Sequence, residues 1–336
     1  MDRRDFLKLT GIASLAGMAG LSVPNLFANA AFREEIIQSG WVDDPSVVRY
    51  FVKNNENPYL SQVNEAIRGT GRGQTAFLWK FFDQVLGRPM LPHEQQIGDC
   101  VSHGYGLGAD ILTATQIVKR KSPQKWVAEA ATEIIYGGGR IEVAANRYGK
   151  RWYGDGMTGT VAAEFVKTYG ILLRQQYLGS WDFTTYDGGL ARTLGSKGVP
   201  DELEPLCRVH PIGCVTLVRS WDEARDCIYN GYPIALCSSQ GFNTRRGRDR
   251  DGFLNPSRNP WMHCMLLAGI DDAYDRPGGL IINSWGTTWI SGPTRHEQPA
   301  GSFWADASVI DRMCKQGDSI ALSCYAGYPR QPYLIF

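Results

Sequence analysis

The sequence predicts an α+β protein with two lobes, because helical patterns fill its first half and short strand patterns fill its second half. Apolar residues recur at helical spacing up to about residue 205, and β-rich segments separated by Gly, Pro, Asn and Asp turns follow. The 336 residues, 43% of them hydrophobic, suffice for one large or two modest cores.

The first thirty residues resemble an export signal. They open on a charged segment containing Arg3 and Arg4, continue as an apolar run rich in Gly and Ala at 9–23, and end on Ala28-Asn29-Ala30. This order is similar to a twin-arginine signal peptide cleaved after Ala30. A membrane anchor is the alternative, but the run is shorter than the roughly 20 residues that span a bilayer. We expect the twin-arginine machinery to export the folded protein to a bacterial periplasm or beyond, where it is not membrane-embedded.

Residues 31–75 are predicted to form an N-terminal extension, and residues 76–336 to form the main domain. The extension is polar, with a short helix at 45–53 and a Gly-rich linker at 69–74. The main domain divides into a helical lobe at about 76–205, a β lobe at about 206–310 and a tail at 311–336.

Helices are expected in four segments of the helical lobe: 75–87, 100–121, 126–140 and 160–170. In the second of these, Gly104 and Gly108 are four residues apart and therefore share a face. Glycine costs about 1 kcal/mol inside a helix, so the pair predicts that another backbone packs closely there. The β lobe is expected to hold a helix at 220–231 and strands at 214–218, 232–239, 263–272 and 279–285.

The composition excludes several classes of protein. Lys and Arg total 35 against 34 for Asp and Glu, so no basic surplus exists to bind nucleic acid. The eight cysteines include no CxxC pair, which argues against a zinc knuckle, and we expect neither a metal nor a cofactor. In an oxidising compartment Cys207 and Cys214 are candidates for a local disulfide.

Three residues in separate segments suggest nucleophilic catalysis. Cys100 lies at the predicted first turn of a helix, where unsatisfied backbone N–H groups and the helix dipole favour a thiolate. His263 opens a strand and is the candidate base. Asn283 ends the next strand, and its amide would orient one imidazole nitrogen and so decide where the other points. A turn at 271–279 would bring the two strands side by side.

These segments resemble the papain family of cysteine peptidases, whose local signature is a known pattern. INSWGTTW (282–289) is similar to the family's Asn-Ser-Trp-Gly segment, and WMHCMLLAGID (261–271) to its histidine strand. DGMTGTVAAEFVKTYGILLRQQY (155–177) is similar to its glycine segment and following helix, and GSFWAD (301–306) to a later aromatic strand. The resemblance covers roughly residues 76 to 310 and implies a papain-like two-lobe fold with the active-site cleft between the lobes.

The resemblance also implies roles for individual residues. Cys100 would be the nucleophile, His263 the base and acid, and Asn283 the residue that orients the histidine. Trp285 and Gly98 would support the site, and Gly156 and Met262 would contact the substrate. The backbone N–H of Cys100 would form half of an oxyanion hole. We therefore expect an exported cysteine endopeptidase that hydrolyses peptide or protein substrates through a thioester.

Departures from the family pattern affect the oxyanion hole, the nucleophile and the extension. Glu94 occupies the position of the family's glutamine donor, so Gln95 or Gln96 would have to replace it, and we favour Gln96 slightly. Asp99 is expected to cap the helix, although its carboxylate would raise the pKa of Cys100. Residues 290–300 read as an insertion. The extension lacks the recognisable helical motif of the family's inhibitory propeptide.

Alternatives remain for both the site and the function. Cys100, taken alone, reads as a buried structural thiol, and His103 is a rival base one helical turn away, although its side chain is expected to project elsewhere. The same fold also supports an amidase or transpeptidase acting on cell-wall peptides. A catalytically weak homologue that serves as a binding module is the remaining alternative.

Overall fold

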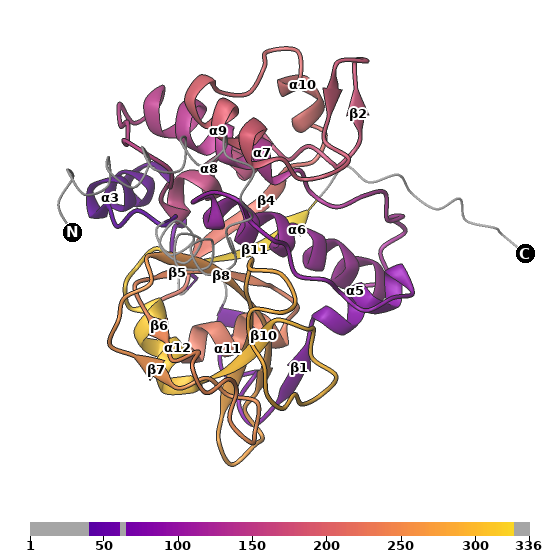
Figure 1. The fold of residues 1–336 in the computed structure, drawn as a ribbon, viewed down its shortest axis with the longest axis vertical. Coiled ribbons are helices and arrows are strands. Elements are labelled where there is room, and N and C mark those ends of the chain that lie inside the picture. The colour runs from indigo at the N-terminus through magenta and orange to yellow at the C-terminus, as the bar shows by residue number, and fades with distance from the viewer. Residues whose placement is uncertain (1–39, 61–64, 326–336) are drawn as a thin grey trace, which may run out of the picture. The chain divides into compact units, whose positions relative to one another are not determined.

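The computed structural model describes residues 40–60 and 65–325 (Figure 1). The expected signal peptide at 1–30 lies outside the described residues, as does the start of the extension up to residue 39. Everything below concerns the compact unit that begins at Ile36 and ends at Phe336. In the described ranges no helix is long and apolar enough to cross a membrane.

A seven-stranded antiparallel sheet forms the β half of this unit. Its strands follow the order β10-β9-β8-β5-β11-β4, and β1 pairs with the far end of β8. The bounds are β1 Thr75–Phe77, β4 Ile212–Leu217, β5 Ile234–Ser238, β8 His263–Asp271, β9 Gly278–Ile282, β10 Ser302–Asp306 and β11 Ile320–Tyr325. Two small hairpins are separate from the sheet: β2 Gln176–Tyr177 with β3 Trp181–Asp182, and β6 Gly241–Phe242 with β7 Pro256–Ser257.

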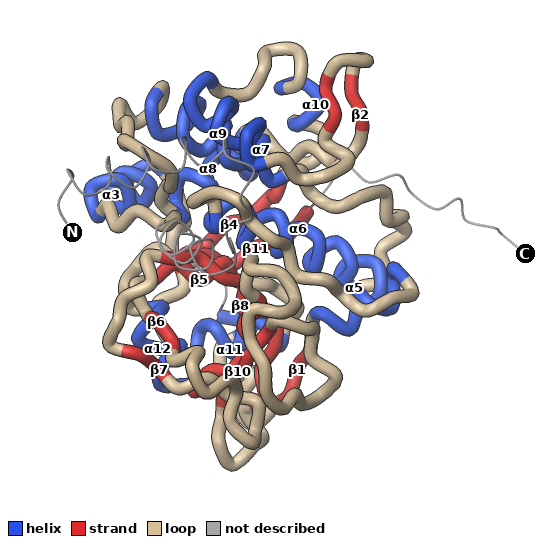
Figure 2. The backbone as a smooth tube through the Cα atoms, in the orientation of Figure 1, coloured by secondary structure: helices blue, strands red, loops and turns tan. Residues whose placement is uncertain are grey.

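Of the helices, α7 to α10 gather at the end of the unit opposite β6, β7 and β10, whereas α11 and α12 lie beside these strands (Figure 1). The α-helices are α3 Pro45–Asn54, α5 Trp79–Leu86, α6 Cys100–Val118, α7 Thr132–Gly138, α8 Gly159–Thr168, α9 Gly188–Lys197, α10 Glu204–Cys207, α11 Trp221–Tyr229 and α12 Ala307–Cys314. A 3₁₀ turn spans Glu65–Ile67 and a π-helical stretch spans Gly139–Ala145. Loops make up most of the chain between β5 and β8 and between β9 and β10 (Figure 2).

Two hydrophobic clusters support the predicted two-lobe α+β architecture. One joins α6, α7, α8 and α9, and the other lies around β8, β9 and β10. The helix α6 contributes to both clusters, because it is buried along almost its whole length. It therefore helps to connect the lobes, together with β5, β8 and β11, which also contribute residues to both clusters.

The glycines of α6 allow the close packing that their spacing predicts. A Cβ on Gly104 would lie 2.8 Å from Sγ of Cys264, and a Cβ on Gly108 would lie 2.7 Å from a methyl of Leu322. The closest neighbours are thus side chains of β8 and β11 rather than another backbone. The sheet approaches α6 closely because both positions lack a side chain.

Two of the predicted helices begin later than expected. The first three residues of 75–87 form β1 instead, because Thr75–Phe77 pairs with Gly269 to Asp271 of β8. Similarly, α7 begins at Thr132, and the chain before it pairs through Ala130 with Leu173. In both places tertiary pairing overrides the local helical pattern.

Three further expectations are corrected. The expected tail at 311–336 contains the end of α12 and then β11, which lies inside the sheet between β5 and β4. The Gly-rich stretch at 69–74 is packed rather than free, since the N–H groups of Gly69 and Gly71 donate to Asp226 at 2.6 and 3.0 Å. All eight cysteines lie within the described ranges and are free thiols, so the disulfide between Cys207 and Cys214 is wrong.

The end of α8 provides a stability test. Gly170 has φ of +86°, and a Cβ there would collide with the carbonyl oxygen of Cys207. We predict that Gly170→Ala lowers the free energy of unfolding by about 2–4 kcal/mol, because strain and collision add. The control Gly179→Ala, with φ of +70° and open space around it, should cost only about 1 kcal/mol. Equal losses in urea denaturation would contradict this account.

Candidate active site

Cys100 is the first residue of α6 and its side chain is fully buried. Its Sγ accepts a hydrogen bond from the backbone N–H of Cys264 at 3.3 Å. Asp99 takes the N-cap position, as expected, but its side chain makes no capping hydrogen bond. The thiol therefore lies where the helix begins and faces the first residues of β8.

His263 and Asn283 come together at the ends of neighbouring strands, as the sequence order predicts. Nε2 of His263 lies 2.7 Å from Oδ1 of Asn283, which also accepts from the N–H of Ser284 at 2.7 Å. An amide oxygen only accepts, so Nε2 carries the proton in this pair. Nδ1 is then the nitrogen with a free lone pair, and it is buried with no hydrogen-bond partner among the described residues.

Trp285 covers this pair, as expected. Its ring centroid lies 5.0 Å from that of His263, at an interplanar angle of 36°. Trp261 and Trp289 pack against Trp285 in turn, with ring centroids 4.9 Å from it. The aromatic cluster keeps water away from the bond between His263 and Asn283, which strengthens that bond.

Burial disfavours the charged forms of both Cys100 and His263. Burial is the main cause that raises the pKa of the Cys100 thiol well above its usual range, and Cys264 and Asp99 add to it. Burial likewise lowers the pKa of His263 to about 4, against the opposing effect of the bond to Asn283. No hydrogen bond joins Sγ of Cys100 to Nδ1 of His263, so the expected thiolate–imidazolium pair is absent from the described site.

The candidate oxyanion donors are placed differently from one another. Gln96 is exposed, and its side-chain oxygen accepts from the N–H of Gly188 at 3.1 Å, which turns the amide toward α9. Gln95 is buried; its Nε2 donates to the carbonyl of Ile97 at 2.8 Å and its Oε1 accepts from the hydroxyl of Ser284. The Glu94 carboxylate lies beside Gly286. The slight preference for Gln96 therefore finds no support in its orientation.

A short N-terminal segment, Gly40 to Val42, covers the site. Gly40 packs so tightly on Cys100 that a Cβ there would lie 2.6 Å from Sγ and 2.7 Å from the carbonyl oxygen of Gly98. The N–H of Trp41 donates to the carbonyl of Met262 at 2.9 Å. On the other side, Met157 donates to the Gly40 carbonyl and accepts from Val42, both at 3.1 Å.

This covering segment thus lies in extended pairing between Met157 and Met262, and Met262 is one of the two residues expected to contact substrate. A Cβ on Gly156 would lie 3.0 Å from the Gly40 carbonyl oxygen, so Gly156 also lines the covered groove. Sequence reasoning missed the covering segment. Its one signal is a tryptophan in an otherwise polar extension.

Asp318 anchors the covering segment. The indole N–H of Trp41 donates to its carboxylate at 2.7 Å, and Trp41 is 2% exposed. The same carboxylate accepts from the N–H groups of Gly159 and Thr160 at 2.6 and 2.8 Å, at the beginning of α8. Nevertheless burial raises the pKa of Asp318 to about 6. No sequence motif marked this residue.

His103, the rival base, faces away from the thiol. Its Nδ1 lies 3.1 Å from Nδ1 of His93, and its Nε2 lies 3.4 Å from Oδ1 of Asp99. Both ring nitrogens are thus directed at other groups than Cys100, in agreement with the expected projection. Within the ranges that the structure describes, no cluster of three or more His, Cys, Asp or Glu residues is arranged to hold a metal ion.

Comparison with solved structures identifies the architecture. Xylellain, a cysteine protease from Xylella fastidiosa, is 16% identical over 85% of this chain and 91% of its own, with a TM-score of 0.51. This likeness shows a papain-like fold. The pro-form of the ragweed pollen cysteine protease Amb a 11 (11% identity, 88% and 76% coverage, TM-score 0.49) and procathepsin B S9 from Trypanosoma congolense (10%, 87% and 86%, 0.48) are also similar. Neither a protein-family model nor a curated protein sequence matches the chain.

The papain-like fold agrees with the α+β expectation, and the assignment of roles to Cys100, His263 and Asn283 remains a prediction. The geometry places His263 against Asn283, Cys100 against Cys264, the next residue after His263, and the ring of Trp285 against that of His263. It also brings Gly156 and Met262 to the groove that the covering segment fills. Gly98 lies beneath Gly40 and its N–H faces Asp155 at 3.4 Å.

The raised pKa of Asp318 predicts a dependence of stability on pH. Its value of about 6 exceeds the usual 3.8, so the folded state binds this proton more tightly than the unfolded state. The contribution of Asp318 to stability is therefore complete below pH 4 and is lost as the pH rises through about 6. Asp318→Asn removes this dependence.

The measurement is urea unfolding of both proteins between pH 4 and pH 7.5. Relative to Asp318→Asn, the native chain should lose about 2–3 kcal/mol of stability over this interval, since each pKa unit corresponds to about 1.4 kcal/mol. A difference between the two proteins that does not change with pH would contradict the account of Asp318.

Proposed function

We propose that this chain is a cysteine peptidase that hydrolyses peptide bonds through a thioester on Cys100. The observation that carries the proposal is the bond of 2.7 Å between His263 and Asn283, with Cys100 at the helix end beside the same strand. Asn283 leaves Nδ1 of His263 free to accept a proton, and the backbone contact between Cys264 and Sγ brings the thiol to the same strand end. This is the arrangement that nucleophilic catalysis by a thiol requires.

The reaction divides into two displacements at the substrate carbonyl. Nδ1 of His263 takes the Cys100 proton while Sγ attacks the carbonyl carbon, and the imidazolium then protonates the leaving amine. A thioester and a free amine result. In the second step His263 removes a proton from water, which attacks the thioester and releases the carboxylic acid and the thiol. Throughout both steps Asn283 accepts a hydrogen bond from Nε2 of His263, so that the proton transfers take place at Nδ1.

Of the two glutamines, Gln95 is the better oxyanion donor. It is buried, and Ser284, next to the catalytic Asn283, holds its side-chain oxygen. Its Nε2 would pair with the backbone N–H of Cys100 once it leaves the carbonyl of Ile97. Gln96 instead accepts a hydrogen bond at the start of α9, so it would have to turn away from that contact.

The chain with the covering segment in place is an inactive precursor. A substrate requires the space between Met157 and Met262 that the segment fills, and it requires access to Sγ, which Gly40 blocks. Burial is also the main cause of the opposed pKa shifts of Cys100 and His263. Displacement of the segment admits water and so removes the burial that disfavours the charged forms of Cys100 and His263. Transfer of the proton from the thiol to the imidazole then becomes more favourable.

The site of action follows from the first thirty residues. Their resemblance to a twin-arginine signal supports export to the periplasm or beyond, where the peptidase would meet peptide or protein substrates. Cell-wall peptides are the competing substrate class for the same thioester chemistry.

Cys100→Ala tests the proposal. With the covering segment removed by limited proteolysis, the native protein should hydrolyse denatured casein, and Cys100→Ala should lose activity by a factor of at least about 10³. Cys214→Ala, which changes an exposed thiol, is the matched control and should retain full activity. Hydrolysis of a cell-wall peptide but not of casein would support the amidase alternative, and equal activity of Cys100→Ala would refute the nucleophile.

Trp41→Ala tests the covering segment. The change removes a buried ring and its bond to Asp318, so the segment should separate more readily and casein hydrolysis by the uncleaved chain should rise at least about tenfold. Trp181→Ala, on the β2–β3 hairpin, is the control and should leave the activity unchanged. If Trp41→Ala does not raise the activity of the uncleaved chain, the segment is not what limits it.

A further inference from the structure

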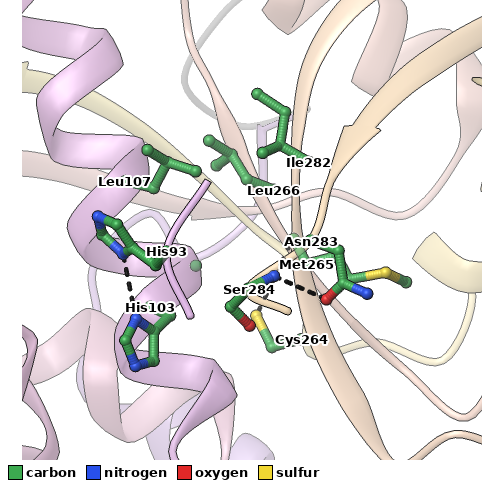
Figure 3. A pocket seen from close by; sticks show the side chains of 10 residues that line it. His93, His103, Leu107, Cys264, Met265, Leu266, Ile282, Asn283 and Ser284 are labelled. Carbon is green, nitrogen blue, oxygen red and sulfur yellow. Dashed lines mark hydrogen bonds between the residues drawn. The ribbon is translucent and has the colours of Figure 1, made fainter. Parts of the chain in front are cut away.

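A chain of polar side chains, with the buried Asp99 and His103 at its centre and the partly buried Tyr186 and His93 at its ends, begins at the residue before Cys100. The hydroxyl of Tyr186 donates to Oδ2 of Asp99 at 2.8 Å, and Oδ1 of Asp99 faces Nε2 of His103 at 3.4 Å. His103 then reaches His93 through their Nδ1 atoms, 3.1 Å apart. Figure 3 shows this histidine contact on one side of a small pocket, with Cys264, Asn283 and Ser284 on the other.

The contacts of His103 define where its protons are. Nε2 of His103 and Oδ1 of Asp99 lie 3.4 Å apart, within ion-pair distance, and neither atom has a hydrogen-bond partner among the described residues, so a proton on Nε2 would be directed at the carboxylate. Nδ1 faces another Nδ1, and one proton must lie between them. Burial and the neighbouring His103 hold the pKa of His93 well below its usual range, so His93 is the neutral partner. His103 therefore lies between the neutral His93 and the carboxylate of Asp99.

Asp99 and His103 each carry a charge that, without the other, would disfavour the charged form of one catalytic residue. The charge of Asp99 raises the pKa of Cys100 and so disfavours the thiolate. The charge of His103 lowers the pKa of His263 and so disfavours the imidazolium. Catalysis needs both ions, and a net charge of zero on the pair weakens both obstacles at once.

We propose that Asp99 and His103 form a buried pair that shares protons and removes net charge from behind the nucleophile, which makes His103 a positioning residue for Cys100. The proposal rests on the peptidase function given above. It explains how a carboxylate is tolerated directly beside a catalytic thiol. His103 acts through Asp99 and has no contact with the reacting atoms.

Other charged or titratable groups around the pair leave this balance intact. Tyr186 donates a neutral hydrogen bond, and burial and Asp99 keep its pKa far above the neutral range. Glu133 adds to the raised pKa of Tyr186, and Arg174 adds to the lowered pKa of His93. Cys264 adds to the raised pKa of Cys100. The countercharge directed at Asp99 in the described site is therefore that of His103.

The test is a double-mutant cycle read by alkylation of Cys100, which needs no substrate. The native chain and the variants His103→Phe, Asp99→Asn and the double variant, each with its covering segment removed by limited proteolysis so that Sγ is accessible, are treated with iodoacetamide between pH 6 and pH 10. The modified Cys100 peptide is then quantified by mass spectrometry. Phenylalanine preserves the ring contacts with Tyr186 and His93. Alkylation of the exposed Cys214 is the internal control and should not change.

His103→Phe leaves Asp99 unbalanced, so the pH profile of Cys100 should move upward by about one unit, with about tenfold slower alkylation at neutral pH. Asp99→Asn should react at least as fast as the native chain. The double variant should return to within about threefold of the native rate, because no charge remains to be balanced.

A purely structural role predicts the opposite pattern. In that case both single variants slow alkylation without a shift in the profile and the double variant is the slowest, which overturns the proposal. An unchanged rate in His103→Phe overturns it as well. Since the readout is thiol reactivity, the charge pair can fail while casein hydrolysis by the native protein still supports the peptidase, and the reverse also holds.

Discussion

The contact between the first turn of α6 and the start of β8 is the interaction on which the site depends. The N–H of Cys264 donates to Sγ of Cys100, and Gly104, one turn further along α6, lets Cys264 approach the helix. Because His263 directly precedes Cys264 in β8, the contact that positions the thiol also positions the backbone of His263. Cys100 thus comes from α6 and His263 from β8, and the packing of this helix on the sheet brings the two segments together.

Burial has two consequences in this molecule that oppose each other. It makes the packing of α6 against the sheet tight, which orients Cys100, His263 and Asn283. It also disfavours charge on both reacting groups, so the covered form holds a neutral thiol beside a neutral imidazole. The covering segment contributes to this directly, since Gly40 packs on Sγ itself. The covering segment therefore blocks access to Sγ and also adds to the burial that disfavours charge on Cys100 and His263.

Much of the fold was accessible from the sequence because local patterns and tertiary structure agree there. The helices at 45–53, 100–121 and 160–170 and the strands that hold His263 and Asn283 were predicted within a few residues. The failures occur where long-range pairing decides. Thr75–Phe77 joins β8 as a strand, and β11 enters the middle of the sheet from a segment that was expected to be a tail.

The site shows the same division. Cys100, His263 and Asn283 were predicted from residue type, order and local context, and the structure places His263 against Asn283 and Cys100 against Cys264, the residue after His263. Asp318 and the covering segment were missed because their contacts join residues 277 apart in the chain. The network of Asp99, His103, His93 and Tyr186 was missed for a similar reason, since Tyr186 reaches Asp99 across 87 residues. The contacts of Trp41 with Asp318 and of Tyr186 with Asp99 leave no spacing pattern in the sequence, whereas Asp99 and His103 are four residues apart, as neighbours on one helix face are.

The central claim, covalent catalysis by Cys100, is tested most directly by trapping the intermediate. The protein with its covering segment removed is mixed with a peptide ester, quenched in acid within its first turnover, digested and analysed by mass spectrometry. The account predicts an acyl group on the peptide that contains Cys100 and on no other of the eight cysteines. Product formation without an acyl group on Cys100, or with one on another residue, would contradict it.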